Sequence, residues 1–119
     1  MQVKTVGVLG CGLMGAGIAQ VSASAGYRTI VREVNQGVLD KGLGRIRKFL
    51  EDGVAKGKVT AEQRDTTLSR LSGTTEFSGM KECDLIVEAI VENVEVKAAA
   101  YSALEAVVGA DTIFASNTS

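Results

Sequence analysis

An apolar strand that runs into the glycine pattern G-x-G-x-x-G, and then into a helix, constrains this chain more than any other feature. The stretch is Val6-Gly7-Val8-Leu9-Gly10-Cys11-Gly12-Leu13-Met14-Gly15-Ala16-Gly17. In this pattern Gly10 permits a tight turn, Gly12 lets a phosphate approach the backbone, and Gly15 lets the helix pack closely. Free N–H groups and the positive dipole end at the helix start favour an anion. The pattern therefore predicts a pyrophosphate site.

A second apolar run ends on an acid where a ribose-binding carboxylate is expected. The run, residues 28–33, follows a predicted helix over 13–25, and Glu33 lies about 20 residues beyond the glycines. Glu33 is the candidate for the ribose hydroxyls, and a solvated charge at a strand end is the alternative. NADP remains an alternative cofactor because Arg32 is next to Glu33, and an arginine at this place can accommodate a 2′-phosphate. The charge of Glu33 repels that phosphate and favours NAD.

Length and composition favour one domain with a small-molecule ligand. The 119 residues are 45% hydrophobic with a formal net charge of −1, which allows a buried core. The sequence has no basic stripe for nucleic acid, no polybasic segment for a membrane surface, and no metal-ligand spacing. The first strand starts without a leader-like segment. Because Cys11 and Cys83 are isolated, we expect free thiols in a cytoplasmic protein, with a redox function of Cys11 left open.

The rest of the chain alternates predicted strands and helices. Asn35 is a candidate N-cap before apolar residues at near-helical spacing, namely Val38, Leu39, Leu43, Ile46, Phe49, Leu50 and Val54. Residues 60–63, Thr-Ala-Glu-Gln, have the form of a capping box and start a shorter helix that contains Leu68 and Leu71. Further elements are expected as strands over 74–77, 84–88 and 112–115, and as a helix over 94–108.

Strands alternating with helices predict an α/β fold with a doubly wound, mostly parallel sheet. The helical excursion over 35–71, between the second and third strands, is longer than a crossover needs. We expect it to reach over the ligand. In such sheets ligands bind at the carboxyl ends of the strands, where the strand order reverses. The glycine loop, Glu33, residues 89–93 and residues 116–119 are therefore expected to line one cleft.

The chain resembles, over its whole length, the N-terminal half of 3-hydroxyacyl-CoA dehydrogenases of the bacterial 3-hydroxybutyryl-CoA dehydrogenase type. The resemblance rests on GCGLMGAGIAQ at 10–20, REVN at 32–35, KGK at 56–58, DLIVEAIVEN at 84–93, Lys97, and ASNTS at 115–119. That family moves a hydride between the 3-hydroxyl of an acyl-CoA thioester and NAD. The resemblance implies that residues 1–119 are a Rossmann-type NAD-binding domain without its last strands. It also implies that the C-terminal helical domain, which completes the substrate site and makes the dimer of relatives, is absent.

The resemblance also implies site residues by position. Cofactor contacts are implied for Gly10, Gly12, Leu13, Met14, Gly15, Ala16, Gly17, Ile18, Glu33, Glu92, Lys97 and Ser119. Ser119 matches a serine near both the nicotinamide and the substrate 3-oxygen, and Asn117 belongs to its supporting turn. A hydroxyl there can stabilise the charge that builds as hydride leaves. Lys56 matches a CoA contact. The alternatives are a solvated side chain for Lys56, an i to i+4 partner of Asn93 or Tyr101 for Lys97, and a frayed terminus for Ser119.

The chain contains no histidine, whereas relatives take a catalytic histidine and its glutamate partner from the stretch that follows Ser119. We therefore expect this chain to bind NAD(H) without turnover. We also expect its fifth strand to be an uncovered edge that favours self-association.

Two other interpretations stay open. A β-hydroxyacid dehydrogenase of the 6-phosphogluconate type shares the Leu13-Met14-Gly15 portion of the loop, but residues 35–71 and the ASNTS ending argue against it. A dinucleotide-sensing module without chemistry is consistent with the missing histidine. Ser119, a residue of catalytic type, argues against such a sensor.

Overall fold

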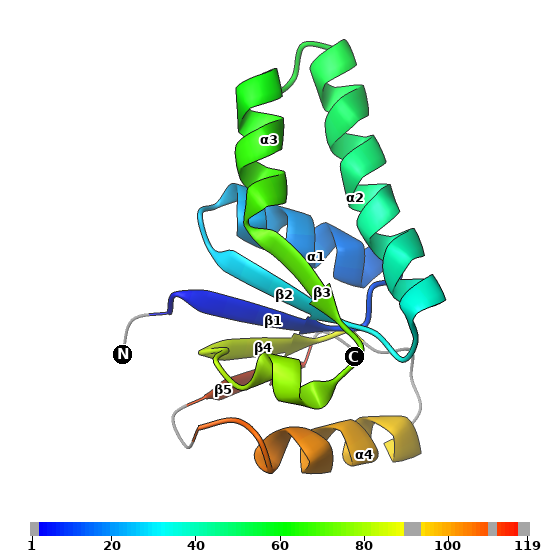
Figure 1. The fold of residues 1–119 in the computed structure, drawn as a ribbon, viewed down its shortest axis with the longest axis vertical. Coiled ribbons are helices and arrows are strands. Elements are labelled where there is room, and N and C mark those ends of the chain that lie inside the picture. Colours follow the sequence, from blue (N-terminus) through cyan, green and yellow to red (C-terminus); the bar gives the residue numbers. More distant parts are fainter. Residues whose placement is uncertain (1–2, 90–93, 110–111, 117–119) are drawn as a thin grey trace.

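The computed structural model describes residues 3–89, 94–109 and 112–116, and these form a sheet of five parallel strands with helices on both faces (Figure 1). The elements along the chain are β1 (Thr5–Leu9), α1 (Leu13–Ser24), β2 (Arg28–Arg32), α2 (Gln36–Ala55), α3 (Ala61–Ser69), β3 (Leu71–Thr74), the 3-10 helix η1 (Phe77–Met80), β4 (Leu85–Glu88), α4 (Val94–Glu105) and β5 (Ile113–Ser116). The strand order is β3-β2-β1-β4-β5, so the direction of winding reverses between β1 and β4. The expected doubly wound parallel sheet is confirmed.

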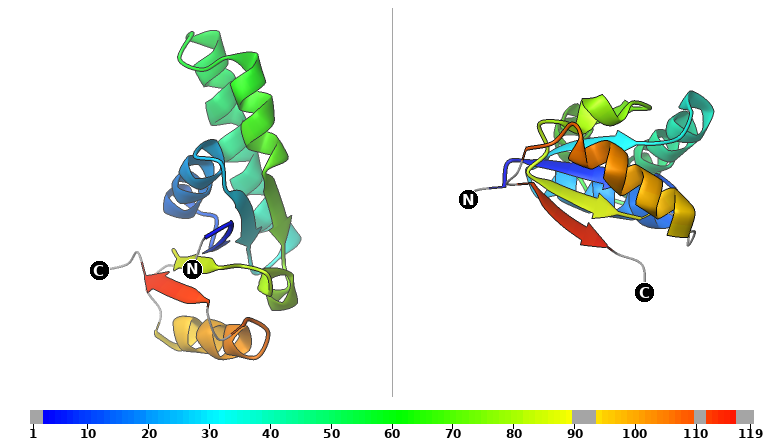
Figure 2. Two further views of the ribbon diagram at one scale, coloured as in Figure 1. Left: turned by 90° about the vertical axis from the view of Figure 1, so that its left-hand side faces the viewer. Right: turned by 90° about the horizontal axis from the view of Figure 1, so that it is seen from below.

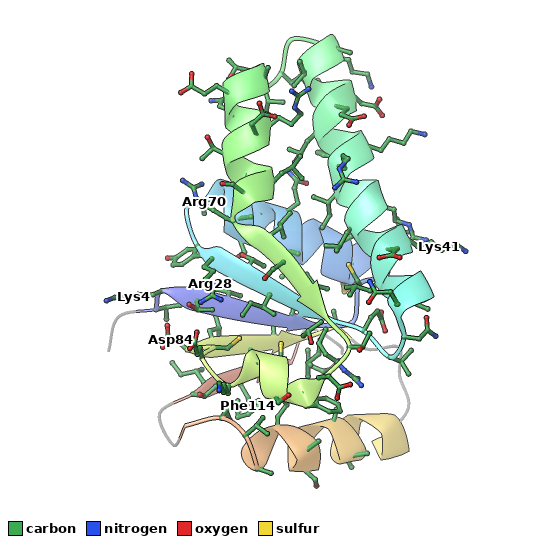
Figure 3. All side chains as sticks on the ribbon, viewed as in Figure 1. Lys4, Arg28, Lys41, Arg70, Asp84 and Phe114 are labelled. Carbon is green, nitrogen blue, oxygen red and sulfur yellow. The ribbon has the colours of Figure 1, made fainter. Side chains whose placement is uncertain are left out.

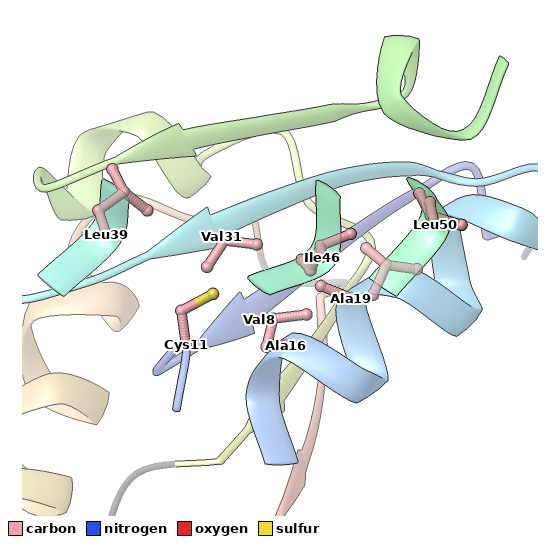
Figure 4. Close-up of a cluster of buried hydrophobic side chains, with 9 residues drawn as sticks. Val8, Cys11, Ala16, Ala19, Val31, Leu39, Ile46 and Leu50 are labelled. Atoms are coloured by element: carbon pink, nitrogen blue, oxygen red, sulfur yellow. The ribbon is translucent and has the colours of Figure 1, made fainter. Parts of the chain in front are cut away.

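The sheet separates two hydrophobic clusters, one on each face. Val8 and Val31 belong to the first cluster, which α1 and α2 cover (Figure 4). Leu9 and Ile30 belong to the second cluster, which contains side chains of α4 and η1. Neighbouring residues of one strand thus enter different clusters, as the two-residue period of a strand requires. Burial on both faces explains why apolar residues occupy adjacent positions in β1 and β2, at Val8-Leu9 and Ile30-Val31.

Helices α2 and α3 form a hairpin whose far end projects beyond the sheet (Figures 1 and 2). Asn35 caps α2 by accepting the N–H of Val38 at 2.9 Å through its side-chain oxygen. Thr60 and Gln63 form a reciprocal capping box at the start of α3, with hydrogen bonds of 2.9 and 3.0 Å. Gly57 turns the chain between the helices with a φ of 72°. Both predicted helix starts are confirmed.

The expectations for Leu71 and for the third strand are wrong. Leu71 starts β3 instead of continuing the helix, because it pairs in parallel register with Thr29 of β2. The strand expected over 74–77 therefore lies earlier, and Phe77 begins η1 and packs against the second cluster. A short apolar spacing fits either a helix or a strand. The pairing with β2 decides between them.

Phe49 departs from the expected apolar face of α2. Ile46 and Leu50 are buried (Figure 4), whereas Phe49 is 63% exposed. Its side chain lines a groove between α1 and α2 together with Leu13 and Val21. Phe49 lies at the margin of the helical stripe that contains Ile46 and Leu50, so the periodicity alone did not distinguish it from the core.

The start of β1 is fastened to β4 through the carboxylate of Asp84 (Figure 3). This carboxylate accepts the backbone N–H groups of Lys4 at 2.9 Å and Thr5 at 3.0 Å. The two hydrogen bonds lower the pKa of Asp84 below its ordinary value, because they stabilise the charged form. The two strands therefore keep a register that brings their carboxyl ends to the same edge of the sheet.

Strand β5 lies at an edge of the described sheet, as expected for the fifth strand. Its first residue, Ile113, is 46% exposed. Exposed apolar edges favour pairing with another chain. Self-association through β5 stays a prediction, which light scattering over a range of concentrations checks.

Helix α2 approaches the glycine loop at Gly42, where an added Cβ would overlap the side chain and carbonyl oxygen of Cys11. A Cβ on Gly44 of the same helix would meet no described atom within 4 Å. We expect Gly42→Ala to lower the free energy of unfolding by about 1–3 kcal/mol through overpacking. Gly44→Ala is expected to raise it by up to about 1 kcal/mol through helix propensity. Urea unfolding followed by circular dichroism measures both, and equal effects would contradict the close approach.

Candidate functional site

The glycine loop between β1 and α1 has the backbone that its sequence predicts. Gly10 has a φ of 94°, a left-handed value that favours glycine, and its N–H donates to the carbonyl oxygen of Arg32 at 3.0 Å. A Cβ on Gly15 would overlap the carbonyl oxygen of Gly10, whereas a Cβ on Gly12 would meet no described atom within 4 Å. The N–H of Ala16 donates to the carbonyl oxygen of Gly12 at 2.8 Å and so begins the ladder of α1. The tight turn and the close helix approach are as expected, and the pyrophosphate stays a prediction.

Glu33 lies directly after β2, and its carboxylate contacts the glycine loop. One oxygen accepts the N–H of Cys11 at 2.7 Å, and the other accepts the N–H of Val34 at 2.9 Å. An ionised carboxylate can accept about four hydrogen bonds. Lone pairs therefore remain on both oxygens for two neighbouring hydroxyl groups, which is the arrangement that a ribose diol needs.

Arg32 precedes Glu33, but its side chain lies on the other face of the sheet. Its Nε donates to the carbonyl oxygen of Thr75 at 3.1 Å, and its guanidinium carbon lies 3.8 Å from the centroid of the Phe77 ring. Burial lowers the pKa of Arg32, while the charges of Glu33 and Glu76 oppose this shift. Sequence reasoning missed Thr75 and Phe77, because nothing in their spacing connects them to β2.

Cys11 is a packing residue of the glycine loop. Its side chain is 1% exposed within the first cluster, beside Gly42 of α2 (Figure 4). Burial, followed by the charge of Glu33, raises the pKa of Cys11 to about 11, and burial also raises the pKa of Cys83 to about 11. A neutral, buried thiol is a poor nucleophile. This environment does not support a redox function for Cys11.

Several predicted contact residues surround the start of α1. Leu13 is 83% exposed and Met14 is 57% exposed, whereas Ala16 is buried. Gly17 and Ile18 line, with other apolar residues, a hollow along α1 that also includes the β4 residues Leu85 and Val87. Sequence reasoning missed Val34, which follows Glu33 and is 67% exposed. An exposed apolar side chain directly after a predicted ribose acid is the signal that could have found it.

Of the remaining predicted site residues, the structure describes the side chain of Lys56, which lies away from the glycine loop. Lys56 caps the far end of α2 and is exposed. Lys56 lies fourteen positions after Gly42, which is about 21 Å along the helix axis, so the hairpin carries Lys56 away from the glycines. Lys97 lies within α4, but its side chain is outside the described residues. Glu92, Asn117 and Ser119 also lie outside them.

The described part of the chain has neither a metal-binding cluster nor a membrane-spanning helix. Residues 3–89, 94–109 and 112–116 contain no group of three or more histidine, cysteine or acidic side chains that could hold a metal ion. Within the same ranges, no helix has the length and apolar character needed to cross a membrane.

The winding reversal beside β1, the glycine loop and the acid after β2 together define a dinucleotide-binding domain of the Rossmann type. A sequence model described as "3-hydroxyacyl-CoA dehydrogenase, NAD binding domain" matches residues 5–119. The chain belongs to this family. Of the two dehydrogenase families considered from the sequence, the match therefore supports the 3-hydroxyacyl-CoA type.

Individual relatives agree with this assignment. The fatty acid oxidation complex subunit alpha of Idiomarina loihiensis is 42% identical over 118 residues, which cover 99% of this chain and 16% of that protein. The crystal structure of Mycobacterium tuberculosis FadB2 is 42% identical with a TM-score of 0.96, and the match covers 100% of this chain and 42% of that one. The crystal structure of 3-hydroxybutyryl-CoA dehydrogenase from Escherichia coli K12 is 38% identical with a TM-score of 0.95. That match covers 100% of this chain and 25% of the other one. The chain thus spans less than half the length of each.

The environments of the two thiols predict low reactivity in the folded protein. Cys11 and Cys83 are buried and their pKa values are raised to about 11. At about pH 8 the thiolate fraction is therefore well below that of an unfolded cysteine. We expect a thiol-specific chromogenic disulfide to label both cysteines slowly in the native chain and rapidly after denaturation. Rapid labelling of either thiol in the native chain would contradict the burial described above.

Proposed function

We propose that this chain is the NAD-binding part of an oxidoreductase that interconverts (S)-3-hydroxyacyl-CoA and 3-oxoacyl-CoA by hydride transfer. The favoured substrate is 3-hydroxybutyryl-CoA, the substrate in the name of the similar E. coli enzyme. The observation that carries the proposal is the 2.7 Å hydrogen bond between the N–H of Cys11 and the carboxylate of Glu33. This bond holds the ribose candidate against the loop that would receive the pyrophosphate.

The chain offers a separate group for each part of the dinucleotide. The backbone of Gly12 and the first turn of α1 suit the pyrophosphate, because the N–H groups of a first helical turn have no intrahelical acceptor. Glu33 suits the adenosine ribose through its remaining lone pairs, and the exposed side chain of Val34 suits an adenine face. When bound, NAD supplies the acceptor or donor of the hydride.

The charges near the ribose favour NAD over NADP. The carboxylate of Glu33 repels a 2′-phosphate, and its oxygens are acceptors that suit free hydroxyls. The cation nearest along the chain, Arg32, is engaged with Thr75 and Phe77 on the other face of the sheet.

The catalytic and substrate-binding groups are proposed by position in the family. Ser119 would hydrogen-bond the substrate 3-oxygen, with Asn117 in its supporting turn. Glu92 and Lys97 would add contacts to NAD. Lys56 would bind a CoA phosphate, and its exposure at the far end of α2 leaves it accessible to one. CoA is a long molecule, so a phosphate contact distant from the glycine loop is compatible with a thioester near the nicotinamide.

Nucleotide binding tests the assignment of Glu33. We expect the fluorescence of NADH to change saturably when it is titrated with the chain. Glu33→Ala should weaken binding by about tenfold to a hundredfold, because hydrogen bonds to a charged group contribute about 1.5–3 kcal/mol. Glu62→Ala, which removes an exposed acid from the first turn of α3, is the matched control and should leave the affinity unchanged.

The titration has two informative failures. An unchanged affinity of Glu33→Ala would contradict the ribose assignment. Absence of NADH binding by a chain that circular dichroism shows to be folded would contradict a self-sufficient nucleotide site.

Acetoacetyl-CoA tests the substrate side of the proposal. Ketone reduction needs a proton donor as well as a hydride, and a chain without histidine lacks the usual one. We therefore expect calorimetric binding of acetoacetyl-CoA but no acetoacetyl-CoA-dependent oxidation of NADH. Lys56→Ala should weaken binding by about twofold to fivefold, as for an exposed ion pair. The control is Lys41→Ala, on the same helix near the sheet (Figure 3). Oxidation of NADH above the blank would contradict the expected lack of turnover. Equal effects of Lys56→Ala and Lys41→Ala would contradict the assignment of Lys56 to CoA.

A further inference from the structure

The end of β2 presents two opposite charges on opposite faces of the sheet. Arg32 contacts Phe77, which packs against the second cluster. Glu33 contacts Cys11, which belongs to the first cluster. Alternation along a strand produces this separation. Only one of the two charges therefore faces the glycine loop.

The contacts of Arg32 are held by a fixed turn. The Thr75 carbonyl that accepts from Arg32 lies between β3 and η1. On one side of this turn the N–H of Glu33 donates to the carbonyl oxygen of Thr74 at 3.1 Å. On the other side the Thr74 hydroxyl oxygen accepts the N–H of Glu76 at 3.0 Å. These two hydrogen bonds fix the backbone of the turn and so hold the Thr75 carbonyl in place as the acceptor for Arg32.

We propose that Phe77 and the Thr75 carbonyl help to select the cofactor by withholding Arg32 from the ribose. A guanidinium free to swing toward Glu33 would offer a cation to a 2′-phosphate. Because the Arg32 guanidinium is held on the Phe77 ring and the Thr75 carbonyl, Glu33 is the member of this charged pair that faces the 2′-position of the ribose, and its carboxylate suits a hydroxyl there. This inference rests on the proposed function and identifies residues that set the preference between the two dinucleotides.

The test compares NADH and NADPH by fluorescence titration of the same chain. The background variant is Glu33→Gln, which removes the repulsive charge but keeps an oxygen to accept the N–H of Cys11. On this background Phe77→Leu removes the aromatic face and keeps an apolar side chain in the cluster. We expect it to tighten NADPH binding by about twofold to fivefold, which matches the strength of an exposed cation–π contact. The affinity for NADH should stay the same.

Removal of Arg32 tests whether this residue causes the gain in NADPH affinity. Adding Arg32→Gln to Glu33→Gln/Phe77→Leu should abolish the gain in NADPH affinity. The matched control is Arg28→Gln, at the opposite end of β2, where Arg28 pairs with Glu82 at 3.1 Å in solvent. Adding Arg28→Gln to Glu33→Gln/Phe77→Leu should leave the gain in NADPH affinity unchanged.

A second variant avoids the cluster altogether and so does not depend on how Phe77→Leu folds. With Phe77 intact, adding Arg32→Gln to Glu33→Gln should change the NADPH affinity by less than about threefold, because a withheld guanidinium makes only a distant contribution. A loss of tenfold or more would mean that Arg32 already reaches the phosphate, and it would overturn the proposal.

The remaining outcomes are equally decisive. If the ratio of NADPH to NADH affinity is the same in Glu33→Gln/Phe77→Leu as in Glu33→Gln, the proposal that Phe77 withholds Arg32 is overturned. A gain in NADPH affinity that persists after Arg32→Gln would also overturn it. Failure of the unmodified chain to bind NADH would overturn the nucleotide site and this inference with it. Normal NADH binding combined with either of the first two results would overturn the inference alone.

Discussion

Close packing of two helices on the loop after β1 is the constraint on which the rest of this structure depends. At Gly15, helix α1 approaches the carbonyl oxygen of Gly10 more closely than a Cβ would allow. At Gly42, helix α2 approaches Cys11 in the same way. Cys11 is buried beside these contacts, and its N–H donates to the carboxylate of Glu33 at 2.7 Å. A packing requirement thus constrains the backbone that would receive a phosphate, and hydrogen bonds from Cys11 and Val34 hold the carboxylate of Glu33 beside it.

The same arrangement separates charges near the site. Arg32 and Glu33 are neighbours in the sequence, but the pleat of β2 directs their side chains to different faces of the sheet. Arg32 contacts Thr75 and Phe77 on one face, and Glu33 contacts Cys11 on the other. The edge of the sheet therefore combines the positive end of the α1 dipole with the carboxylate of Glu33, which accepts the N–H of Cys11 in the glycine loop. Such a pattern suits a dinucleotide, whose pyrophosphate is anionic and whose ribose carries hydroxyl groups.

Much of the fold could be predicted because it is encoded by local patterns. The strand, the glycine loop and α1 follow from contiguous residues, and the caps at Asn35 and Thr60 are short motifs that the structure reproduces. The prediction failed where two conformations satisfy one local pattern. Leu71 fits the end of a helix as well as the start of a strand, and Phe49 fits the margin of a buried stripe as well as a solvent-facing groove.

The sequence by itself determined that an apolar strand leads through glycines into a helix, and that an acid follows the next strand. Both depend on spacing along the chain. The tertiary structure decided that Thr75 and Phe77 hold Arg32, that α2 packs on Cys11 at Gly42, and that Lys56 is carried away from the loop. These contacts join residues distant in sequence, and only the pairing of strands and the packing of helices brings them together.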